Sequence, residues 1–254
     1  ACRPGARRGR GEGVRRPARP LPAMNAMDFE REVVLNPSAG DSELRIRIRE
    51  LPMADGVFGS TGCQLWSASI VLAEELLRRP QLVAGKRVVE VGAGCGLLGI
   101  AVASLARSTV ITDGDEECVM NLTHNLKVNE GCWRSKEGEA PREALARILR
   151  WEDAVESAWP TEERAEVVIA SDIIAGMFGD TVARAFMNIL APGGYIMLNA
   201  HEDRSASVRG FADFLLDAGF QVQENTQSGP LGNFRMYECW REGPGGPGPG
   251  RPPA

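Results

Sequence analysis

The stretch VVEVGAGCGLLGI, residues 88–100, contains two overlapping glycine motifs that predict different ligands. Counted from Gly94, the spacing Gly-x-Gly-x-x-Gly is typical of a dinucleotide-binding loop, and Asp113 follows where such a site binds its ribose. Counted from Glu90, the same residues read Glu-x-Gly-x-Gly-x-Gly, a pattern that suits an adenosyl sulfonium. Both ligands contain adenosine, so the choice depends on the charge attached to it.

The carboxylate of Glu90 favours the sulfonium. A dinucleotide places a pyrophosphate, with roughly two negative charges, at the N-terminus of the helix that follows the loop, and a nearby carboxylate would repel it. A sulfonium nucleoside has no phosphate and is positively charged, so an acid beside it is tolerable or favourable. Glu90 could also brace the loop by accepting backbone N–H groups, and one carboxylate can do both.

The other residues of the motif support an adenosine site without choosing between the two ligands. Gly92, Gly94 and Gly96 let the backbone pass beneath a ligand without Cβ atoms in the way. Asp113 ends a predicted strand and can accept two hydrogen bonds from a ribose diol. Cys95 is expected to pack as a small side chain, because neither histidine of the chain is placed as an obvious base for a nucleophile.

Alternating apolar patterns around this loop predict an α/β fold with a doubly wound, mostly parallel seven-stranded Rossmann-like sheet. Right-handed crossovers make the first five strands parallel. The last two are too close in sequence to form anything but a hairpin, so the final strand is antiparallel. Residues 42–51 add a short N-terminal β extension, and a helix that stops at Pro80 leads into the sheet. The strands are predicted at residues 87–91, 108–113, 146–151, 165–174, 194–200, 220–225 and 234–240, with helices at 96–106, 117–129, 181–190 and 209–219.

Composition divides the chain into three parts. Residues 1–27 are rich in Arg, Pro and Gly, and residues 242–254 in Gly and Pro; both are predicted to be disordered because they have too few apolar residues to offset the entropy of ordering. The Arg-rich start resembles a transit peptide without its serines or amphipathic period, and translated leader sequence is an equal interpretation. Residues 28–241 are expected to form one domain.

Charge and cysteine usage exclude several classes of function. Residues 1–27 hold seven arginines and one acid, which leaves 33 acidic and 22 basic side chains elsewhere, a formal charge of −11. So acidic a body repels nucleic acid and favours lysine- or arginine-bearing partners. No apolar run approaches the roughly 18 residues of a membrane span. The six cysteines lack zinc-site spacing, so reduced thiols and no metal are expected.

On these residues the chain resembles the class I, seven-strand methyltransferases, within them the protein-lysine methyltransferase-like branch grouped with nicotinamide N-methyltransferase-like proteins. The similarity covers about residues 30–240. The segments that carry it are GCQLWSASIVLAEEL, VVEVGAGCGLLGI, ITDGDEECVMNLTHNLKVN, LRWEDA and ASDIIAG. The resemblance implies S-adenosyl-L-methionine as the cofactor and a protein with an accessible lysine as the partner.

The resemblance also implies which residues form the site. Asp172 would stand at the mouth of the transfer site, and the cofactor would contact Trp66, Gly92, Ala93, Gly94, Asp113, Trp151 and Ser171. The pattern agrees for Trp151 and Asp172, since each is expected to end a strand at the edge where open α/β folds bind ligands. Asp172, a lone carboxylate there, could orient the acceptor ammonium or help pass its proton to water. Trp133, Trp159 and Trp240 receive no role.

One departure from the family pattern affects the choice of acceptor. The family follows its aspartate with a tyrosine three positions on, whereas here that position is Ala175. Three hypotheses therefore stay open: a protein methyltransferase acting on lysine, a small-molecule methyltransferase, and a non-catalytic methyltransferase-like binding protein. A dehydrogenase is a more distant alternative. A monomer in the cytoplasm is expected.

Overall fold

The computed structural model describes residues 29–36, 43–51, 61–157, 159–174 and 179–241. The segments predicted to be disordered, 1–27 and 242–254, lie outside these ranges, as does Ala175. No helix within the described ranges is long and apolar enough to cross a membrane.

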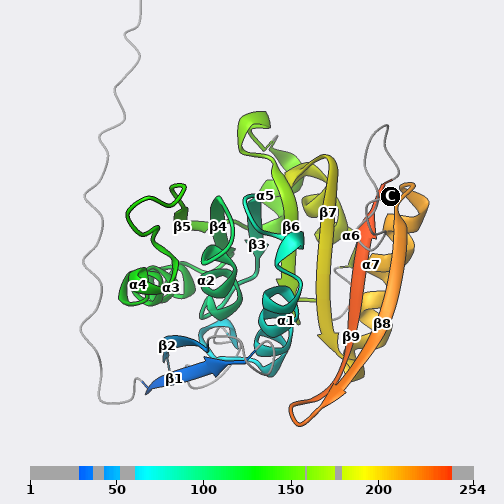
Figure 1. Ribbon diagram of the computed structural model, residues 1–254. Helices are drawn as coiled ribbons and strands as arrows, with labels where there is room; N and C mark the ends of the chain where they lie inside the picture. Colours follow the sequence, from blue (N-terminus) through cyan, green and yellow to red (C-terminus); the bar gives the residue numbers. More distant parts are fainter. Residues whose placement is uncertain (1–28, 37–42, 52–60, 158, 175–178, 242–254) are drawn as a thin grey trace, which may run out of the picture.

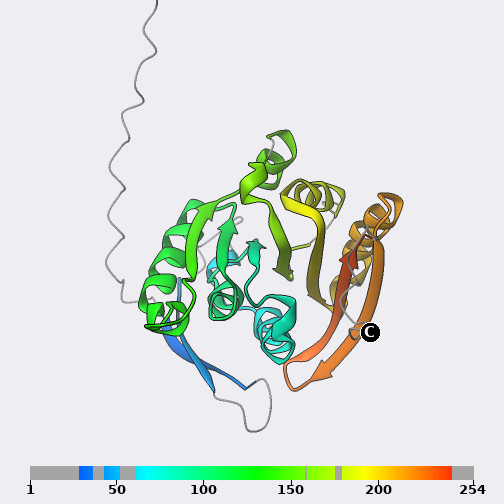
Figure 2. The same cartoon turned by 45° about the horizontal axis from the view of Figure 1, so that its top comes forward.

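A seven-stranded sheet forms the centre of the described chain (Figures 1 and 2). Its strand order is β5-β4-β3-β6-β7-β9-β8, and β9 alone runs in the direction opposite to the other six strands. The predicted fold class and the antiparallel last strand are therefore confirmed. The strands are β3 (Arg87–Val91), β4 (Ser108–Asp113), β5 (Glu143–Ile148), β6 (Ala165–Ser171), β7 (Leu190–His201), β8 (Gln221–Gly229) and β9 (Gly232–Trp240).

Helices cover both faces of the sheet, because the central strands present apolar side chains on each face. Val88 packs into one core with α1, α2 and α3, while its neighbour Val89 packs into a second core with α6 and α7. Figure 1 shows the first group in front of the sheet and the second behind it. The helices are α1 (Ser67–Arg78), α2 (Leu97–Ala103), α3 (Glu116–Val128), α4 (Glu130–Trp133), α5 (Trp151–Glu156), α6 (Gly179–Ile189) and α7 (Ser205–Asp217). Single 3₁₀ turns are η1 (Thr61–Cys63), η2 (Pro80–Leu82), η3 (Thr161–Glu163) and η4 (Glu202–Arg204).

Local sequence explains where several helices begin and end. The carboxylate of Asp115 caps α3 by accepting the backbone N–H groups of Glu117 and Cys118, and two acids follow in the first turn. Helix α1 ends just before Pro80, which opens the next 3₁₀ turn.

Several predicted boundaries are wrong, among them the end of the strand predicted at 165–174, which is β6 at Ala165–Ser171, and the start of the helix predicted at 209–219, which is α7 at Ser205–Asp217. The third strand is β5 at Glu143–Ile148, not 146–151, so Trp151 begins α5 instead of ending a strand. It is an edge strand whose Leu145 and Ile148 are exposed, so burial imposes no alternation on its sequence. Strand β7 starts at Leu190, before the glycines expected to separate helix from strand. The terminal hairpin turns at residues 230–231, so the two strands pair through residues 226–229 and 232–233, which were not predicted as strand. Residues 226–229 belong to β8, an edge strand whose side chains are largely polar, so no apolar alternation marks them.

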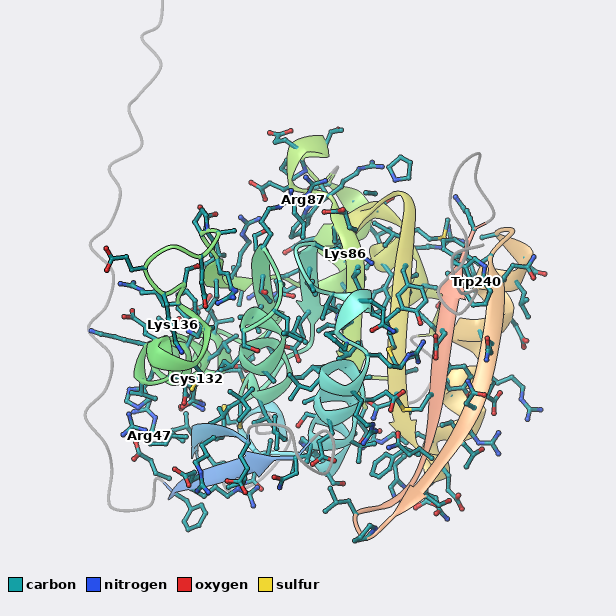
Figure 3. All side chains as sticks on the ribbon, viewed as in Figure 1. Arg47, Lys86, Arg87, Cys132, Lys136 and Trp240 are labelled. Carbon is teal, nitrogen blue, oxygen red and sulfur yellow. The ribbon has the colours of Figure 1, made fainter. Side chains whose placement is uncertain are left out.

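The N-terminal extension is an antiparallel hairpin of β1 (Phe29–Leu35) and β2 (Leu44–Glu50), separate from the main sheet. Ile46 and Ile48 are fully buried against the first core, whereas the alternating Arg45 and Arg47 point outward. Figure 3 shows Arg47 on this hairpin, well away from Lys86 and Arg87 at the start of β3 and from Trp240 at the end of β9. The predicted N-terminal β extension is therefore confirmed.

Two asparagines of α3 and the asparagine that follows its last residue attach the hairpin to the domain. Asn121, Asn125 and Asn129 are spaced by four and therefore share one helix face. Their amides pair with the backbone of β2 at Arg49 and Arg47 as a neighbouring strand would, with donor–acceptor distances of 2.7 to 3.1 Å. The Asn125 amide also donates to the carbonyl oxygen of Cys95 at 3.0 Å, which links this face to the glycine loop.

We expect Asn125→Ala to lower the free energy of unfolding by about 2–4 kcal/mol, because it leaves the buried Arg49 N–H and Cys95 carbonyl without this partner. The matched control on the same helix is Lys127→Ala, at an exposed position, which should change stability by less than about 0.5 kcal/mol. Urea denaturation measures both. Equal losses in the two variants would show that the asparagine face does not hold the hairpin.

Candidate functional site

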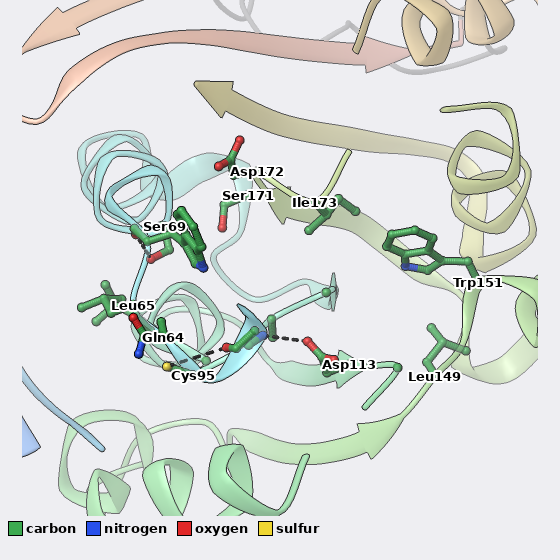
Figure 4. Close-up of a pocket in the computed structure, with 18 of the residues that line it drawn as sticks. Gln64, Leu65, Ser69, Cys95, Asp113, Leu149, Trp151, Ser171, Asp172 and Ile173 are labelled. Atoms are coloured by element: carbon green, nitrogen blue, oxygen red, sulfur yellow. Dashed lines mark hydrogen bonds between the residues drawn. The ribbon is translucent and has the colours of Figure 1, made fainter. Parts of the chain in front are cut away.

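A pocket of about 460 Å³ opens at the carboxyl ends of β3, β4 and β6. After β3 the chain continues to β4 and β5 on one side of β3 and then crosses to β6 on the other side. The pocket therefore lies at the crossover where open α/β sheets bind ligands. Figure 4 shows Ser171 and Asp172 on one side of the pocket and Asp113 on the other. The lining comes from residues 62–69, the loop after β3, the ends of β4 and β6, residues 149–152 and Arg204.

The loop after β3 has no space for side chains at its first two glycines. Gly92 has φ +68°, and a Cβ there would lie 2.6 Å from Cγ2 of Ile173, the residue after Asp172. Gly94 has φ +54°, and a Cβ there would overlap the carbonyl oxygen of Gly62. The loop therefore lies between the segment before α1 and the turn after β6, and only glycine fits.

Asp113 fixes the loop from the neighbouring strand. One carboxylate oxygen accepts the N–H of Gly94 at 2.9 Å and the other accepts the N–H of Asp115 at 3.0 Å. Burial raises the pKa of Asp113, and these backbone hydrogen bonds oppose the rise. A carboxylate accepts about four hydrogen bonds, so Asp113 keeps capacity for a ligand hydroxyl in the pocket that it lines.

Glu90 is the one predicted site residue that does not line the pocket. Its side chain is buried beneath α2, where its Oε2 occupies the space a Cβ of Gly99 would need. Neither carboxylate oxygen has a hydrogen-bond partner in the described part of the chain. The predicted contact of Glu90 with a ligand stays a prediction, and the structure places this side chain outside the pocket lining. β3 turns this side chain toward α2, where the backbone N–H of Gly99 favours the charged form of Glu90 without making a hydrogen bond of ordinary geometry.

Burial also shifts the pKa of Glu90. It raises the pKa of this carboxyl well above its usual value, the Gly99 N–H opposes the rise, and the charge of Asp113 adds to it. Gly99, the third glycine of the dinucleotide-like spacing, is required for packing against Glu90 and Ile111 and does not line the pocket.

The pocket brings together all the other predicted site residues: Asp172, Trp66, Gly92, Ala93, Gly94, Gly96, Asp113, Trp151 and Ser171. Trp66 stands before α1 with 44% of its surface exposed, and Trp151 enters from the start of α5. Trp133 and Trp159 are buried structural residues whose indole N–H groups donate to backbone carbonyls. Burial raises the pKa of the Cys95 thiol, which agrees with a packing role.

Asp172 is not the lone carboxylate that the sequence indicates. Its Oδ1 lies 3.1 Å from Nε of Arg204 and accepts the backbone N–H of His201 at 3.2 Å. Its φ of +53° makes it the one non-glycine residue with positive φ in the described ranges. Burial raises its pKa, while Arg204, the His201 N–H and the His201 charge oppose the rise.

Sequence reasoning missed Arg204, Ser69 and Arg150 as pocket residues. Arg204 follows β7 and meets Asp172 only because β6 and β7 are paired, so no local pattern could reveal it. Ser69 and Arg150 lie close to Trp66 and Trp151 in sequence and could have been inferred from them. No cluster of potential metal ligands occurs among the described residues.

Comparison with known proteins matches residues 47–212 to the model of a family described as lysine methyltransferase. This range includes every residue that lines the pocket.

The curated relatives include the protein-lysine N-methyltransferase EFM3 of Chaetomium thermophilum, 36% identical over 121 residues, which covers 45% of this chain and 34% of that protein. The protein-lysine N-methyltransferase EEF2KMT of Mus musculus is 29% identical over 123 residues, 46% of this chain and 36% of that one. The matches thus span about a third of the relatives' length.

Among solved structures, the T. thermophilus 16S rRNA N2 G1207 methyltransferase, in complex with AdoMet and guanosine, aligns with a TM-score of 0.57 and 18% identity. The alignment covers 87% of this chain and 52% of that one. At this identity the likeness concerns the fold alone.

We expect Glu90→Gln to be more stable than the parent protein at pH 8, with the advantage shrinking toward pH 5. The folded-state pKa of Glu90 is raised above the unfolded value of about 4.3, so the folded protein binds more protons between the two values. Its stability therefore falls as pH rises through that window, and a neutral amide removes the loss. Denaturant midpoints at several pH values measure this, with the exposed Glu116→Gln as the control. An advantage that does not depend on pH would contradict a buried titrating carboxyl.

We expect Gly94→Ala to lower the free energy of unfolding by at least about 2 kcal/mol, because its Cβ meets backbone and its φ is positive. Gly210→Ala is the matched control: it lies within α7 with open space around it, so alanine should be neutral or stabilising. Thermal and urea unfolding distinguish them. A stable Gly94→Ala protein would mean that the loop can move away from Gly62.

Proposed function

Because the chain belongs to the lysine methyltransferase family, we propose that it transfers a methyl group from S-adenosyl-L-methionine to a lysine side chain of a protein substrate. The observation that supports this most strongly is the convergence of the glycine loop, Asp113 and Asp172 on one crossover pocket inside the matched range.

The residues of the pocket fit the proposed cofactor. Its volume lies within the range of roughly 300–1,000 Å³ typical of small-molecule sites. Asp113 would hold the ribose, the bare backbone of Gly92 and Gly94 would pass close to the ligand, and Trp66 and Trp151 would wall it. Charge alone does not separate this ligand from a dinucleotide, since Glu90 stays out of the pocket and both Arg150 and Arg204 line it. Family membership favours the sulfonium.

When bound, S-adenosylmethionine supplies a methyl group on a sulfonium, a good leaving group for direct displacement. The task of this chain is then to hold the acceptor nitrogen in line at near-contact distance. A lysine with an ordinary pKa of about 10.4 must lose its proton before it can attack. Asp172 would orient the amine and help pass that proton to water, since its carboxylate is held rigidly at the pocket.

We propose a protein acceptor because the acidic body, with a formal charge of −11 outside residues 1–27, would attract basic segments and repel nucleic acid. We further propose that the protein is a monomer located in the cytoplasm. Light scattering of the purified protein and fractionation of cells that express it would test these two points.

When the protein is incubated with radiolabelled S-adenosylmethionine and whole-cell protein extract, we expect the label to appear on protein. After hydrolysis of the labelled protein, the label should be found on lysine. Label on a metabolite pool alone would indicate a small-molecule methyltransferase, and cofactor binding without any transfer a non-catalytic protein.

We expect Asp172→Ala to lower the rate of transfer by about 10²-fold or more while S-adenosylhomocysteine still binds, because positioning of the amine is lost and the glycine loop is not. Calorimetry with the product and the label assay measure the two effects. The exposed Asp217→Ala serves as the control and should change neither. Unchanged turnover in Asp172→Ala would refute the role of this carboxylate.

A further inference from the structure

The carboxylate at the proposed transfer site already has a cationic partner. Nε of Arg204 lies 3.1 Å from Oδ1 of Asp172, and both residues line the pocket. The Asp172 side chain is 9% exposed and that of Arg204 is 33% exposed. The pair is therefore partly shielded from solvent, where a charge–charge interaction is stronger than at an open surface.

Asp172 is held in place independently of Arg204. Its backbone N–H donates to the carbonyl of Asn199 at 2.8 Å, and its Oδ1 accepts the N–H of His201. Its positive φ persists because these contacts and the packing of Ile173 against Gly92 determine the turn. The carboxylate would thus remain at the pocket if Arg204 were removed, and only its charge partner would change.

The remaining charged groups around Asp172 do not replace Arg204. On β7 and η4, His201 pairs with Asp203 at 3.2 Å, next to Glu202. Across the pocket stand Asp113, Arg150 and Glu152, while the Cys95 thiol is buried in the glycine loop and α1 contributes the uncharged Ser69. Arg204 is the cation in ion-pair contact with Asp172 among the described residues.

We infer that Arg204 is a specificity-determining residue that makes the acceptor end of the pocket select a neutral amine over an ammonium. This rests on the proposed function. An unpaired aspartate would bind the ammonium form and hold its proton, whereas the aspartate–arginine pair presents little net charge. The neutral form of lysine, which is the form able to attack, is then bound more favourably relative to the charged form.

Calorimetry with two ligands tests this without an identified protein substrate. S-adenosylhomocysteine is the demethylated product, and sinefungin is the analogue in which a carbon bearing a primary amine replaces the methylated sulfur. The ratio of their affinities reports how the pocket receives an ammonium where the methyl group would be. Removing one unit charge several ångströms away should alter that ratio about tenfold.

In Arg204→Gln, sinefungin should therefore bind about tenfold tighter relative to S-adenosylhomocysteine at pH 7. The gain should shrink toward pH 10, where an alkyl amine loses its proton. Asp172→Asn should shift the ratio the opposite way, and the double variant should return it near that of the parent protein. Arg204→Lys, which keeps the charge, should behave as the parent does.

Two results would overturn the inference. An unchanged ratio in Arg204→Gln would show that its charge does not act on the acceptor position. A parallel loss of both affinities would show instead that Arg204 binds the amino-acid carboxylate that the ligands share. Failure of the parent protein to bind S-adenosylhomocysteine would instead refute the proposed function. Melting temperatures within a few degrees of the parent would show that each variant is folded.

Discussion

The loop after β3 has no free volume, and the arrangement of the site follows from this constraint. Gly62 lies against it on one side and Ile173 on the other, at two of the positions where a Cβ would overlap a neighbour. The segment before α1 and the turn after β6 are thus fixed relative to each other through a glycine backbone. Trp66 and Asp172 belong to those two segments, so the rim and the inner wall of the pocket are positioned by the same contact.

Side chains of β4 and α3 also fix the same loop. Asp113 fixes the N–H of Gly94, and Asn125 fixes the carbonyl of Cys95 while binding the edge of β2. The N-terminal hairpin is therefore coupled to the ligand loop through one asparagine side chain. The hairpin therefore contributes to the structure of the ligand loop, because the amide of Asn125 forms hydrogen bonds to buried backbone groups of both segments at once.

How much the sequence predicts depends on whether a feature is local. The glycine spacing and Asp113 lie within one βαβ unit, so their convergence follows from the fold pattern. The spacing of Asn121, Asn125 and Asn129 was also visible and indicates one helix face. Its partner β2 was not predictable, because a docked hairpin leaves no signal in the helix. Glu90 was misplaced since β3 is buried on both faces, and periodicity cannot say which face a polar residue takes.

Burial raises the pKa of two carboxyls near the pocket, but their surroundings differ, and the difference bears on substrate recognition. Glu90 lies in an apolar setting without an ion-pair partner, whereas a guanidinium beside Asp172 opposes the rise in its pKa. Neither presents an unpaired anion to an arriving lysine. If the inner pocket has so little attraction for a cation, affinity for a basic protein segment must come from outside it. The exposed face of Trp66 at the rim and the acidic surface beyond are the available sources, so the pocket would select the reactive nitrogen and the surface would select the protein.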